Sequence, residues 1–359
     1  MAATPTPRPI PAEPAAGGPL VQSPQHPQEP ALVPALLHGA GNPAVPALQA
    51  YAQRHPVSLP VAVAYSGGAD STALLLAAVQ CWPGQVKAVH VHHGLQAAGD
   101  DFARHCQQVC QTLSVPLEVM RVKAHPAPGQ SPEDAARRAR YPALAQAARR
   151  WGCAMVLLAQ HGDDQAETVM LALGRGSGLP GLAAMPERFE RDGAAFGRPL
   201  LELSAAGIRQ WLVDHGHGFV DDPSNQDTRY SRNRLRQRLM PALAEVLPHY
   251  RQTLARSARH AAQAQTLLDE VAAEDLEQVG CPPRLQALQA LSAARQANVL
   301  RHWLAGSHGV RPSAAQLDEL LAQVAACTTR GHRISLKVAT GHVLRQGAEL
   351  SYQEASGVA

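Results

Sequence analysis

The segment Ser66–Ser71, which reads SGGADS, joins an apolar run at Val61–Tyr65 to a helical run that starts at Thr72. Two successive glycines let the backbone turn tightly and approach an anion without an intervening Cβ atom. The helix that follows offers unpaired N–H groups and a positive dipole end. The segment therefore predicts a phosphate-binding turn, formed by Ser66, Gly67, Gly68, Ala69, Asp70 and Ser71. The alternative is an ordinary strand-to-helix turn with a serine or aspartate cap.

Asp70 is an unexpected residue in an anion site, because its carboxylate would repel a phosphate. Two interpretations account for it. The carboxylate caps the following helix, or it holds a magnesium ion that bridges the phosphates. The sequence leaves both open.

Three acidic residues, Asp163, Asp164 and Glu167, follow another apolar run at Met155–Ala159. Their spacing places the three carboxylates within one helical turn, where they repel one another unless a cation lies among them. Magnesium or a cationic substrate would supply that charge. In the alternative interpretation, Asp163 or Asp164 caps the helix and Glu167 closes a capping box.

Two groups of arginines have the residue types that bind phosphate. Arg137 and Arg140 lie three residues apart on one helix face, where a guanidinium stabilises charge that develops on a phosphate. Alternate-residue arginines in the second group do not share a helical face, which suits contact with a phosphate backbone. That group contains Arg232, Asn233, Arg234 and Arg236. For both groups the alternative is a solvated basic face.

Histidines and cysteines raise the question of a metal site. His90, His92 and His93 end a predicted strand, but no Cys or His stands downstream at zinc-like spacing, so no zinc site is expected. We expect His93 to contact a nucleotide or an RNA substrate, and His90 to pack in the interior. Cys106 and Cys110, four residues apart on a predicted helix, are expected to be buried.

Alternating strand and helix patterns predict the elements that position these residues. Apolar runs at 61–65, 86–91, 117–122 and 155–159 indicate buried strands, and helical patterns at 71–81, 101–113 and 132–151 lie between them. The alternation predicts an α/β fold with a parallel sheet and helices on both faces. Sites in such sheets lie at the carboxyl ends of the strands.

The rest of the chain does not show this alternation of strands and helices. Residues 1–40 are rich in proline and predicted to be a disordered tail. A nucleotide-binding domain is predicted at 59–240, and a helical region at 241–359 ends in short strands separated by Gly341 and Gly347.

Composition excludes several classes of protein. The 359 residues carry a formal net charge of +3, and 45% of them are hydrophobic, which suffices for a substantial core. No apolar run reaches the roughly 18 residues of a membrane span, and six cysteines in such a length do not form a disulfide framework. We therefore expect a cytoplasmic protein, with an oligomeric state that the sequence leaves open.

The SGGADS loop after a first strand resembles the PP-loop ATP pyrophosphatases, which cleave ATP between the α and β phosphates. The Walker pattern of the γ-phosphoryl transferases is absent. Further motifs follow in order: HVHHGL at 90–95, SPEDAARRARY at 131–141, AQHGDDQAET at 159–168, RGSG at 175–178, DDPSN at 221–225 and YSRNRLR at 230–236. Together they resemble the bacterial tRNA(Ile)-lysidine synthase family over about residues 60–350.

The resemblance implies a reaction and a set of roles. Such a ligase uses ATP, with magnesium, to adenylylate the wobble cytidine of an isoleucine tRNA bearing a CAU anticodon, and L-lysine then displaces AMP. The implied catalytic residues are Asp70, Arg137, Asp164 and Glu167. Residues 66–71 and His93 would bind ATP. Lysine or metal would be bound by Asp163, Asp164 and Glu167. The tRNA would be bound by Arg232, Asn233, Arg234 and Arg236.

Three other functions compete with this one. A cytidine thiolase shares the loop but generally relies on cysteines, and this chain has no CxxC pair. An NAD or GMP synthetase would leave the arginine-rich segments unexplained. A non-catalytic RNA-binding protein would not need a complete phosphate loop.

Overall fold

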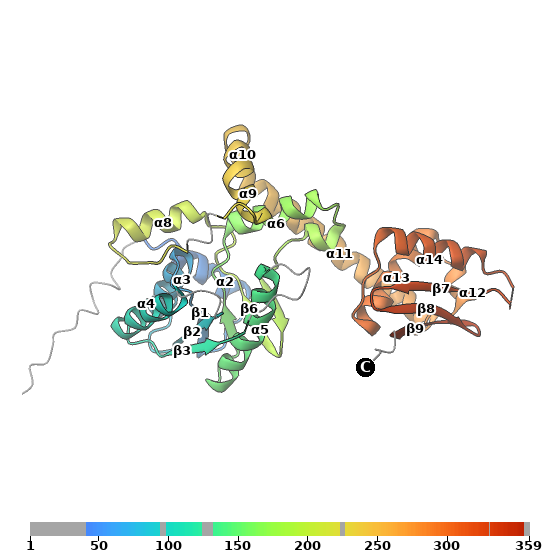
Figure 1. Ribbon diagram of the computed structural model, residues 1–359, viewed down its shortest axis with the longest axis horizontal. Coiled ribbons are helices and arrows are strands. Elements are labelled where there is room, and N and C mark those ends of the chain that lie inside the picture. The colour runs from blue at the N-terminus through green and yellow to red at the C-terminus, as the bar shows by residue number, and fades with distance from the viewer. Residues whose placement is uncertain (1–40, 94–97, 124–131, 223–226, 330, 355–359) are drawn as a thin grey trace, which may run out of the picture.

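The computed structural model describes residues 41–93, 98–123, 132–222, 227–329 and 331–354. Two bodies lie at the ends of one long helix, α11 (Tyr250–Val279) (Figure 1). The tail predicted at residues 1–40 lies outside the described residues. Within the described part, no helix combines the length and the apolar character needed to cross a membrane.

The first body is built on a six-stranded sheet. Its strands are β1 (Val61–Ala64), β2 (Val86–His92), β3 (Leu117–Arg121), β4 (Met155–Leu157), β5 (Arg188–Arg191) and β6 (Ala194–Gly197). Their order is β3-β2-β1-β4-β6-β5, and every neighbouring pair is parallel except β5 with β6. The predicted parallel sheet is confirmed, and the four predicted strands differ only at their ends. The sequence did not indicate β5 and β6.

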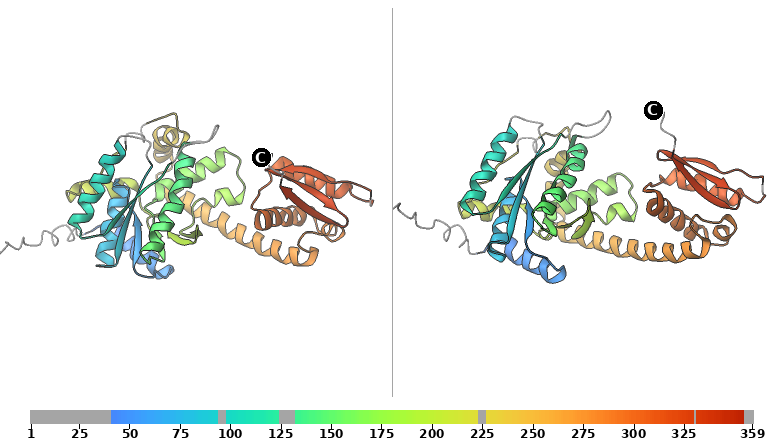
Figure 2. Two further views of the ribbon diagram at one scale, coloured as in Figure 1. Left: turned by 60° about the horizontal axis from the view of Figure 1, so that its bottom comes forward. Right: turned by 90° about the horizontal axis from the view of Figure 1, so that it is seen from below.

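Both faces of the sheet are covered, because alternate residues of each strand point to opposite sides. Val61 and Val63 of β1 pack in one hydrophobic cluster, whereas Ala62 packs in the other. Four helices supply the first cluster: α2 (Ala44–Arg54), α3 (Ala69–Cys81), α4 (Ala98–Thr112) and α8 (Ala205–Asp214). Helix α5 (Pro132–Arg150) covers the opposite face (Figure 2).

Two helices between β4 and β5, and three elements between α8 and α11, complete the first body. These are α6 (Gly162–Gly174), α7 (Leu179–Leu182), α9 (Ser231–Arg234), the π-helical turn η2 (Leu235–Leu239) and α10 (Met240–Val246). One end of α11 packs on α6 and α7, and the other end packs on α13 (Ala293–His308). The boundary predicted at 240/241 falls at the start of α10.

The second body has its own core around the buried Trp303. It contains α12 (Leu285–Gln289), α13, α14 (Ala314–Ala326) and an antiparallel sheet of β7 (Ser335–Val338), β8 (Gly341–Gln346) and β9 (Glu349–Glu354). The predicted C-terminal strands are confirmed. Gly341, however, begins β8 instead of forming the turn, which uses Ala339 at φ 52°. A Cβ atom at Gly341 would lie 2.3 Å from the carbonyl oxygen of Gln353, so the neighbouring strand requires glycine there.

Gly197 shows how closely the first body is packed. Tyr51 of α2 is fully buried, and a Cβ atom at Gly197 would lie 2.4 Å from the Tyr51 hydroxyl oxygen. We expect Gly197→Ala to lower the free energy of unfolding by about 1–3 kcal/mol, a typical cost of overpacking, as measured by urea denaturation.

Gly174→Ala is the matched control, because no atom lies within 4 Å of the added Cβ atom at that position. Equal stability of the Gly197→Ala and Gly174→Ala proteins would show that Tyr51 of α2 does not pack tightly against β6.

Candidate active site at the carboxyl edge of the sheet

The predicted phosphate loop lies between the end of β1 and the start of α3. Gly68 is the N-cap residue of α3, and Gly67 adopts φ +86°, a conformation that favours glycine. The hydroxyls of Ser66 and Ser71 lie 3.0 Å apart, and the Ser71 hydroxyl also donates to the Gly68 carbonyl at 3.0 Å. The Val220 amide donates to the Gly67 carbonyl at 2.9 Å. These bonds hold the loop with the amino end of α3 facing a cavity.

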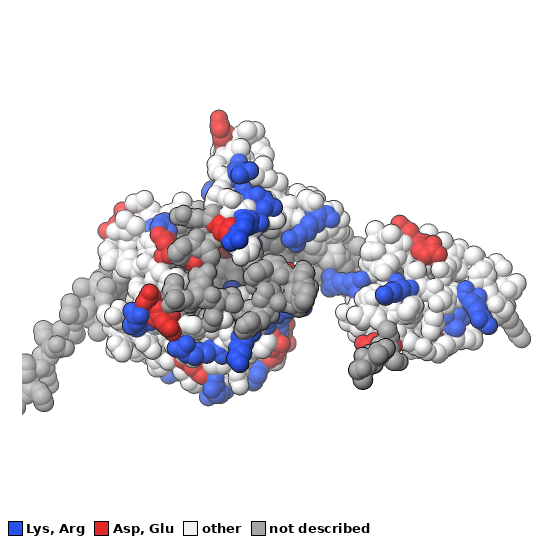
Figure 3. All heavy atoms as spheres, viewed as in Figure 1, with Lys and Arg blue, Asp and Glu red and all other residues white. Residues whose placement is uncertain are grey.

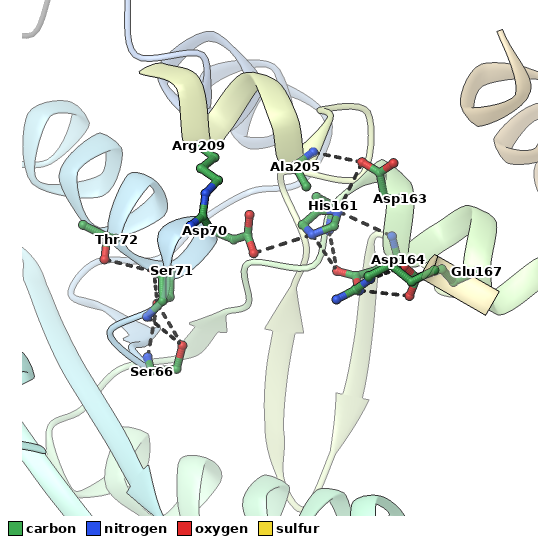
Figure 4. A network of polar contacts seen from close by, with 12 residues as sticks. Ser66, Asp70, Ser71, Thr72, His161, Asp163, Asp164, Glu167, Ala205 and Arg209 are labelled. Atoms are coloured by element: carbon green, nitrogen blue, oxygen red, sulfur yellow. Dashed lines mark hydrogen bonds and ion pairs between the residues drawn. The ribbon is translucent and has the colours of Figure 1, made fainter. Parts of the chain in front are cut away.

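Asp70 lies in the first turn of α3 but does not cap it. Gly68 occupies the cap position without any side-chain cap bond, so the capping interpretation of Asp70 is wrong. The carboxylate is about one-third exposed, and its Oδ2 atom lies 3.5 Å from Nε2 of His161 (Figure 4). The Asp70 carboxylate therefore points toward His161, which follows the carboxyl end of β4.

His161 forms the centre of the polar network. Only 4% of the residue is exposed, and its ring nitrogens lie 3.5, 3.8 and 3.4 Å from carboxylate oxygens of Asp70, Asp163 and Asp164. Burial alone would lower the pKa of His161, but these three carboxylates raise it to about 9. The imidazole is therefore a cation at neutral pH, and the 3.4 Å contact from the Asp164 amide to Nδ1 is correspondingly long.

His161 is also the N-cap residue of α6. Asp164 accepts the His161 amide at 3.1 Å. The Asp164 amide can donate to Nδ1 only when the ring is neutral, so a protonated His161 leaves the capping box half formed. The predicted box, capped by Asp163 or Asp164 and closed by Glu167, is therefore wrong, because the cap is His161 and the N3 residue is Asp164. Histidine occupies the cap because α6 begins at Gly162, which places Asp163 and Asp164 inside its first turn.

The three predicted acids do not converge on one point. Asp163 accepts the Ala205 amide at 2.9 Å, the Tyr250 hydroxyl at 3.2 Å and Nε of Arg251. Burial raises the pKa of Asp163, but the Ala205 and Arg251 donors outweigh burial and hold that pKa below its usual value. Among the described residues, the charge of these acids is balanced by His161 and by arginines from later in the chain.

Glu167 is the most buried of the acids, at 1% exposure. Its carboxylate accepts Nε of Arg232 at 3.0 Å, Nε of Arg236 at 2.7 Å and a terminal nitrogen of Arg236 at 3.1 Å. The Arg236 guanidinium also reaches Asp164 at 3.3 Å. The α9–η2 segment is thus fastened to α6 by two arginines one helical turn apart.

The four predicted tRNA-binding residues point in different directions, as their spacing suggested. Arg232 and Arg236 turn inward to Glu167, whereas Arg234 is exposed and donates to the carbonyls of Thr228 and Arg229. Asn233 donates to a backbone carbonyl at 2.9 Å.

Two cavities, each of about 620 Å³, meet at these residues. The first is lined by the phosphate loop, the end of β2 with His93, and Arg140 and Arg232. The second is lined by Asp163, Glu167, Arg209, Asp221 and Tyr250. Asp70, His161 and Arg236 border both.

Arg137 is exposed and does not line either cavity, whereas Arg140 lines the first. His93 is a neutral base there, because burial and then the nearby Arg140 lower its pKa to about 4. Its Nδ1 atom is buried and has no hydrogen-bond partner among the described residues.

Comparison with known proteins explains why these motifs occur together. A PP-loop domain model matches residues 46–243, and a model described as the TilS substrate binding domain matches residues 284–350. A tRNA(Ile)-lysidine synthase of Polaromonas naphthalenivorans is 61% identical over 317 residues, which cover 88% of this chain and 96% of that protein. The chain belongs to the tRNA(Ile)-lysidine synthase family.

Other relatives differ in length or in sequence. A tRNA(Ile)-lysidine synthase of Burkholderia pseudomallei is 45% identical over 76% of this chain, which spans 57% of that relative's length. A solved U34-tRNA thiolase of Methanococcus maripaludis aligns with a TM-score of 0.52 at 15% identity, over 61% of this chain and 77% of that one. At this identity the likeness shows the fold alone.

In this lysidine synthase family member, the cysteines are not arranged for sulfur chemistry. Cys106 and Cys110 are buried on α4, as predicted, and burial raises the pKa of each thiol to about 12. His90 is buried and contacts the Tyr65 carbonyl at 3.0 Å, which fits the packing role predicted for it. Within the described ranges, no three His, Cys, Asp or Glu residues are grouped to hold a metal ion.

The sequence did not indicate the partners of the acids. Tyr250 and Arg251 lie 87 and 88 residues after Asp163, and no local pattern connects them. His161 had a usable signal, since it directly precedes the acidic segment at the end of a predicted strand.

The raised pKa of His161 predicts a pH dependence of stability. Because the folded pKa of about 9 lies above the ordinary value of 6.5, the stabilisation is complete below pH 6.5 and is lost as pH rises through 9. We expect His161→Gln to lower the free energy of unfolding at pH 6.5 by on the order of 2–3 kcal/mol. The difference from the unsubstituted protein should shrink toward pH 9.5.

Urea denaturation across this pH range provides the measurement, and His260→Gln, at an exposed position on α11, is the control. A destabilisation by His161→Gln that does not change with pH would contradict the assignment of a buried cation.

Proposed function

We propose that the chain ligates L-lysine to carbon 2 of the wobble cytidine in the isoleucine tRNA that bears a CAU anticodon. ATP is consumed, the tRNA is adenylylated as an intermediate, and AMP and pyrophosphate are released. The observation that carries the proposal is the complete phosphate loop opening into a cavity lined by Arg232 and Arg236, in a chain that belongs to this family.

ATP fits the first cavity. Its phosphates would lie at the amino end of α3, where backbone N–H groups and the helix dipole favour negative charge. His93 lines this cavity as a neutral ring, which is compatible with the ATP contact predicted for that residue.

Asp70 fits a magnesium ion that accompanies ATP. Its carboxylate is partly exposed, borders both cavities and does not cap α3. Magnesium commonly uses one or two protein carboxylates together with substrate phosphates, which agrees with a single acid at this loop. When bound, the ion would neutralise phosphate charge.

In the first step, cytidine O2 forms a bond to the α-phosphorus while the bond to pyrophosphate breaks. Arg140 and Arg236 border the cavity and would stabilise the developing charge. The catalytic role of Arg137 stays a prediction, because its exposed side chain lies outside the cavity lining.

In the second step, the amine of lysine bonds to carbon 2 of the cytidine and AMP leaves. Asp163 and Glu167 line the second cavity and Asp164 lines the first. These carboxylates would hold the lysine ammonium groups, and one of them would accept the proton that the attacking amine loses. Glu167 must exchange part of its arginine contacts to do so.

The tRNA would bind the exposed arginine-rich segment and the region from residue 241 onward. Blue lysine and arginine side chains gather over the α9–α10 segment and continue toward the second body (Figure 3). Phosphate contacts by Arg232 and Arg236 would compete with Glu167 for the same guanidinium groups.

Replacing Asp70 tests the phosphate-loop chemistry. We expect Asp70→Asn to reduce tRNA-dependent pyrophosphate release at least about 100-fold, on the scale of losing one charge that stabilises a transition state. Asp101→Asn, at an exposed position on α4, should retain normal release. Unchanged release by Asp70→Asn would remove the carboxylate from the mechanism.

The reaction itself is tested with radiolabelled lysine, ATP, magnesium and an isoleucine tRNA transcript carrying CAU. We expect label to enter the tRNA only when ATP is present, because the cytidine must be adenylylated first. AMP release that requires a sulfur donor in place of lysine would indicate a thiolase. Binding of tRNA without label or AMP would indicate a non-catalytic RNA-binding protein.

A further inference from the structure

Helix α11 carries its charges in the order that opposes its own dipole. Arg251, Arg256 and Arg259 lie near its amino end, and residues 269–279 near its carboxyl end carry Asp269, Glu270, Glu274, Asp275 and Glu277. Acidic residues stabilise the amino end of a helix and basic residues the carboxyl end. In the two terminal turns, where the dipole acts, Arg251 and Glu277 are therefore unfavourable for the isolated helix, and the other charges of α11 gain nothing from the dipole.

The acidic end has partners within the chain. Asp275 is fully buried and accepts Nε of Arg295 at 2.8 Å. Asp269 lies 3.9 Å from a ring nitrogen of His302, and Asn298 donates to the Leu268 carbonyl at 2.6 Å. These contacts fasten α13, and with it the second body, to the carboxyl half of α11.

Of the three arginines near the amino end of α11, only one has a close ion-pair partner among the described residues. Arg251 pairs with Asp163. Within the described residues Arg256 has no ion-pair partner, and the carboxylate nearest to Arg259 is Glu202 at 3.9 Å, with both side chains more than 60% exposed. Exposed pairs of this kind contribute about 0–1 kcal/mol. Neither arginine is therefore explained by an interaction inside the protein.

Arg256 and Arg259 belong to an exposed stripe. Gln252, Arg256, Arg259 and Gln263 are spaced by four, three and four residues, and all four are exposed. This spacing puts them on one face of the helix, over a length of about 16 Å at 1.5 Å per residue. The stripe presents guanidinium and amide N–H donors and carries no acidic side chain.

We infer that this stripe, Gln252–Arg256–Arg259–Gln263, binds the phosphate backbone of a stem of the tRNA substrate. The inference rests on the proposed function and adds a surface to it. Guanidinium and amide donors in a row are the groups that position a nucleic-acid backbone without reading its bases. The stripe begins at the residue after Arg251, which lines the second cavity. It continues along α11, which runs from the first body to the second (Figures 1 and 2).

The test compares two double variants that each remove two arginines. In Arg256→Gln/Arg259→Gln the stripe loses its charge. In Arg149→Gln/Arg150→Gln the same charge is lost from the last turn of α5, where both residues are exposed. Affinity for the isoleucine tRNA transcript is measured by filter binding at several salt concentrations, with circular dichroism as a check on folding.

We expect the stripe variant to bind tRNA about tenfold or more weakly than the α5 variant. The slope of the logarithm of the binding constant against the logarithm of salt concentration should become shallower by roughly 0.7–0.9 for each lost phosphate contact. Lysine incorporation at saturating tRNA should keep its kcat while KM for tRNA rises, because the stripe does not touch the reacting atoms. Equal affinity and equal salt dependence in the two double variants would overturn the inference.

The two proposals can fail separately. If the unsubstituted protein incorporates lysine but the stripe variant binds tRNA like the α5 variant, only the stripe is refuted. If the unsubstituted protein incorporates no lysine yet binds tRNA, and the stripe variant binds it more weakly, the surface stands and the proposed reaction does not.

Discussion

Neutralising the carboxylates of α6 is the constraint on which the rest of this structure depends. Glu167 is almost completely buried, and an unpaired charge in that position would cost several kcal/mol. Its partners, Arg232 and Arg236, come from a segment more than 60 residues away. The α9–η2 segment must therefore pack against α6, which closes one wall of both cavities. Asp163 acts in the same way on the start of α11 through Tyr250 and Arg251.

These ion pairs connect the catalytic body to the second body. Because Arg251 lies in the first turn of α11, its bond to Asp163 holds the helix at the cavity, and the Asp275–Arg295 pair holds α13 near the other end. The length of α11 between these two points sets the separation of the bodies. A tRNA that contacts both must match that separation.

The same arginines that balance buried charge are the groups suited to bind phosphate. Arg236 borders both cavities while it bonds to Glu167 and Asp164. An incoming phosphate would compete with these carboxylates for one guanidinium, and a carboxylate released in this way would be free to take a cationic substrate. Charge exchange of this kind would link the phosphate-bearing and amine-bearing substrates without a large movement of the fold.

Periodicity and loop chemistry in the sequence alone determined the parallel sheet, its first four strands and the phosphate loop, because these features depend on neighbouring residues. The strand β6 escaped prediction because Ala194–Gly197 has little strand propensity and forms a strand through its pairing with β4. The capping of α6 by His161 and the dispersal of the three acids toward separate arginines also needed the tertiary structure. Buried charges that lie far apart in the sequence are paired only when the chain folds, so the spacing of the acids could not indicate the cations that hold them.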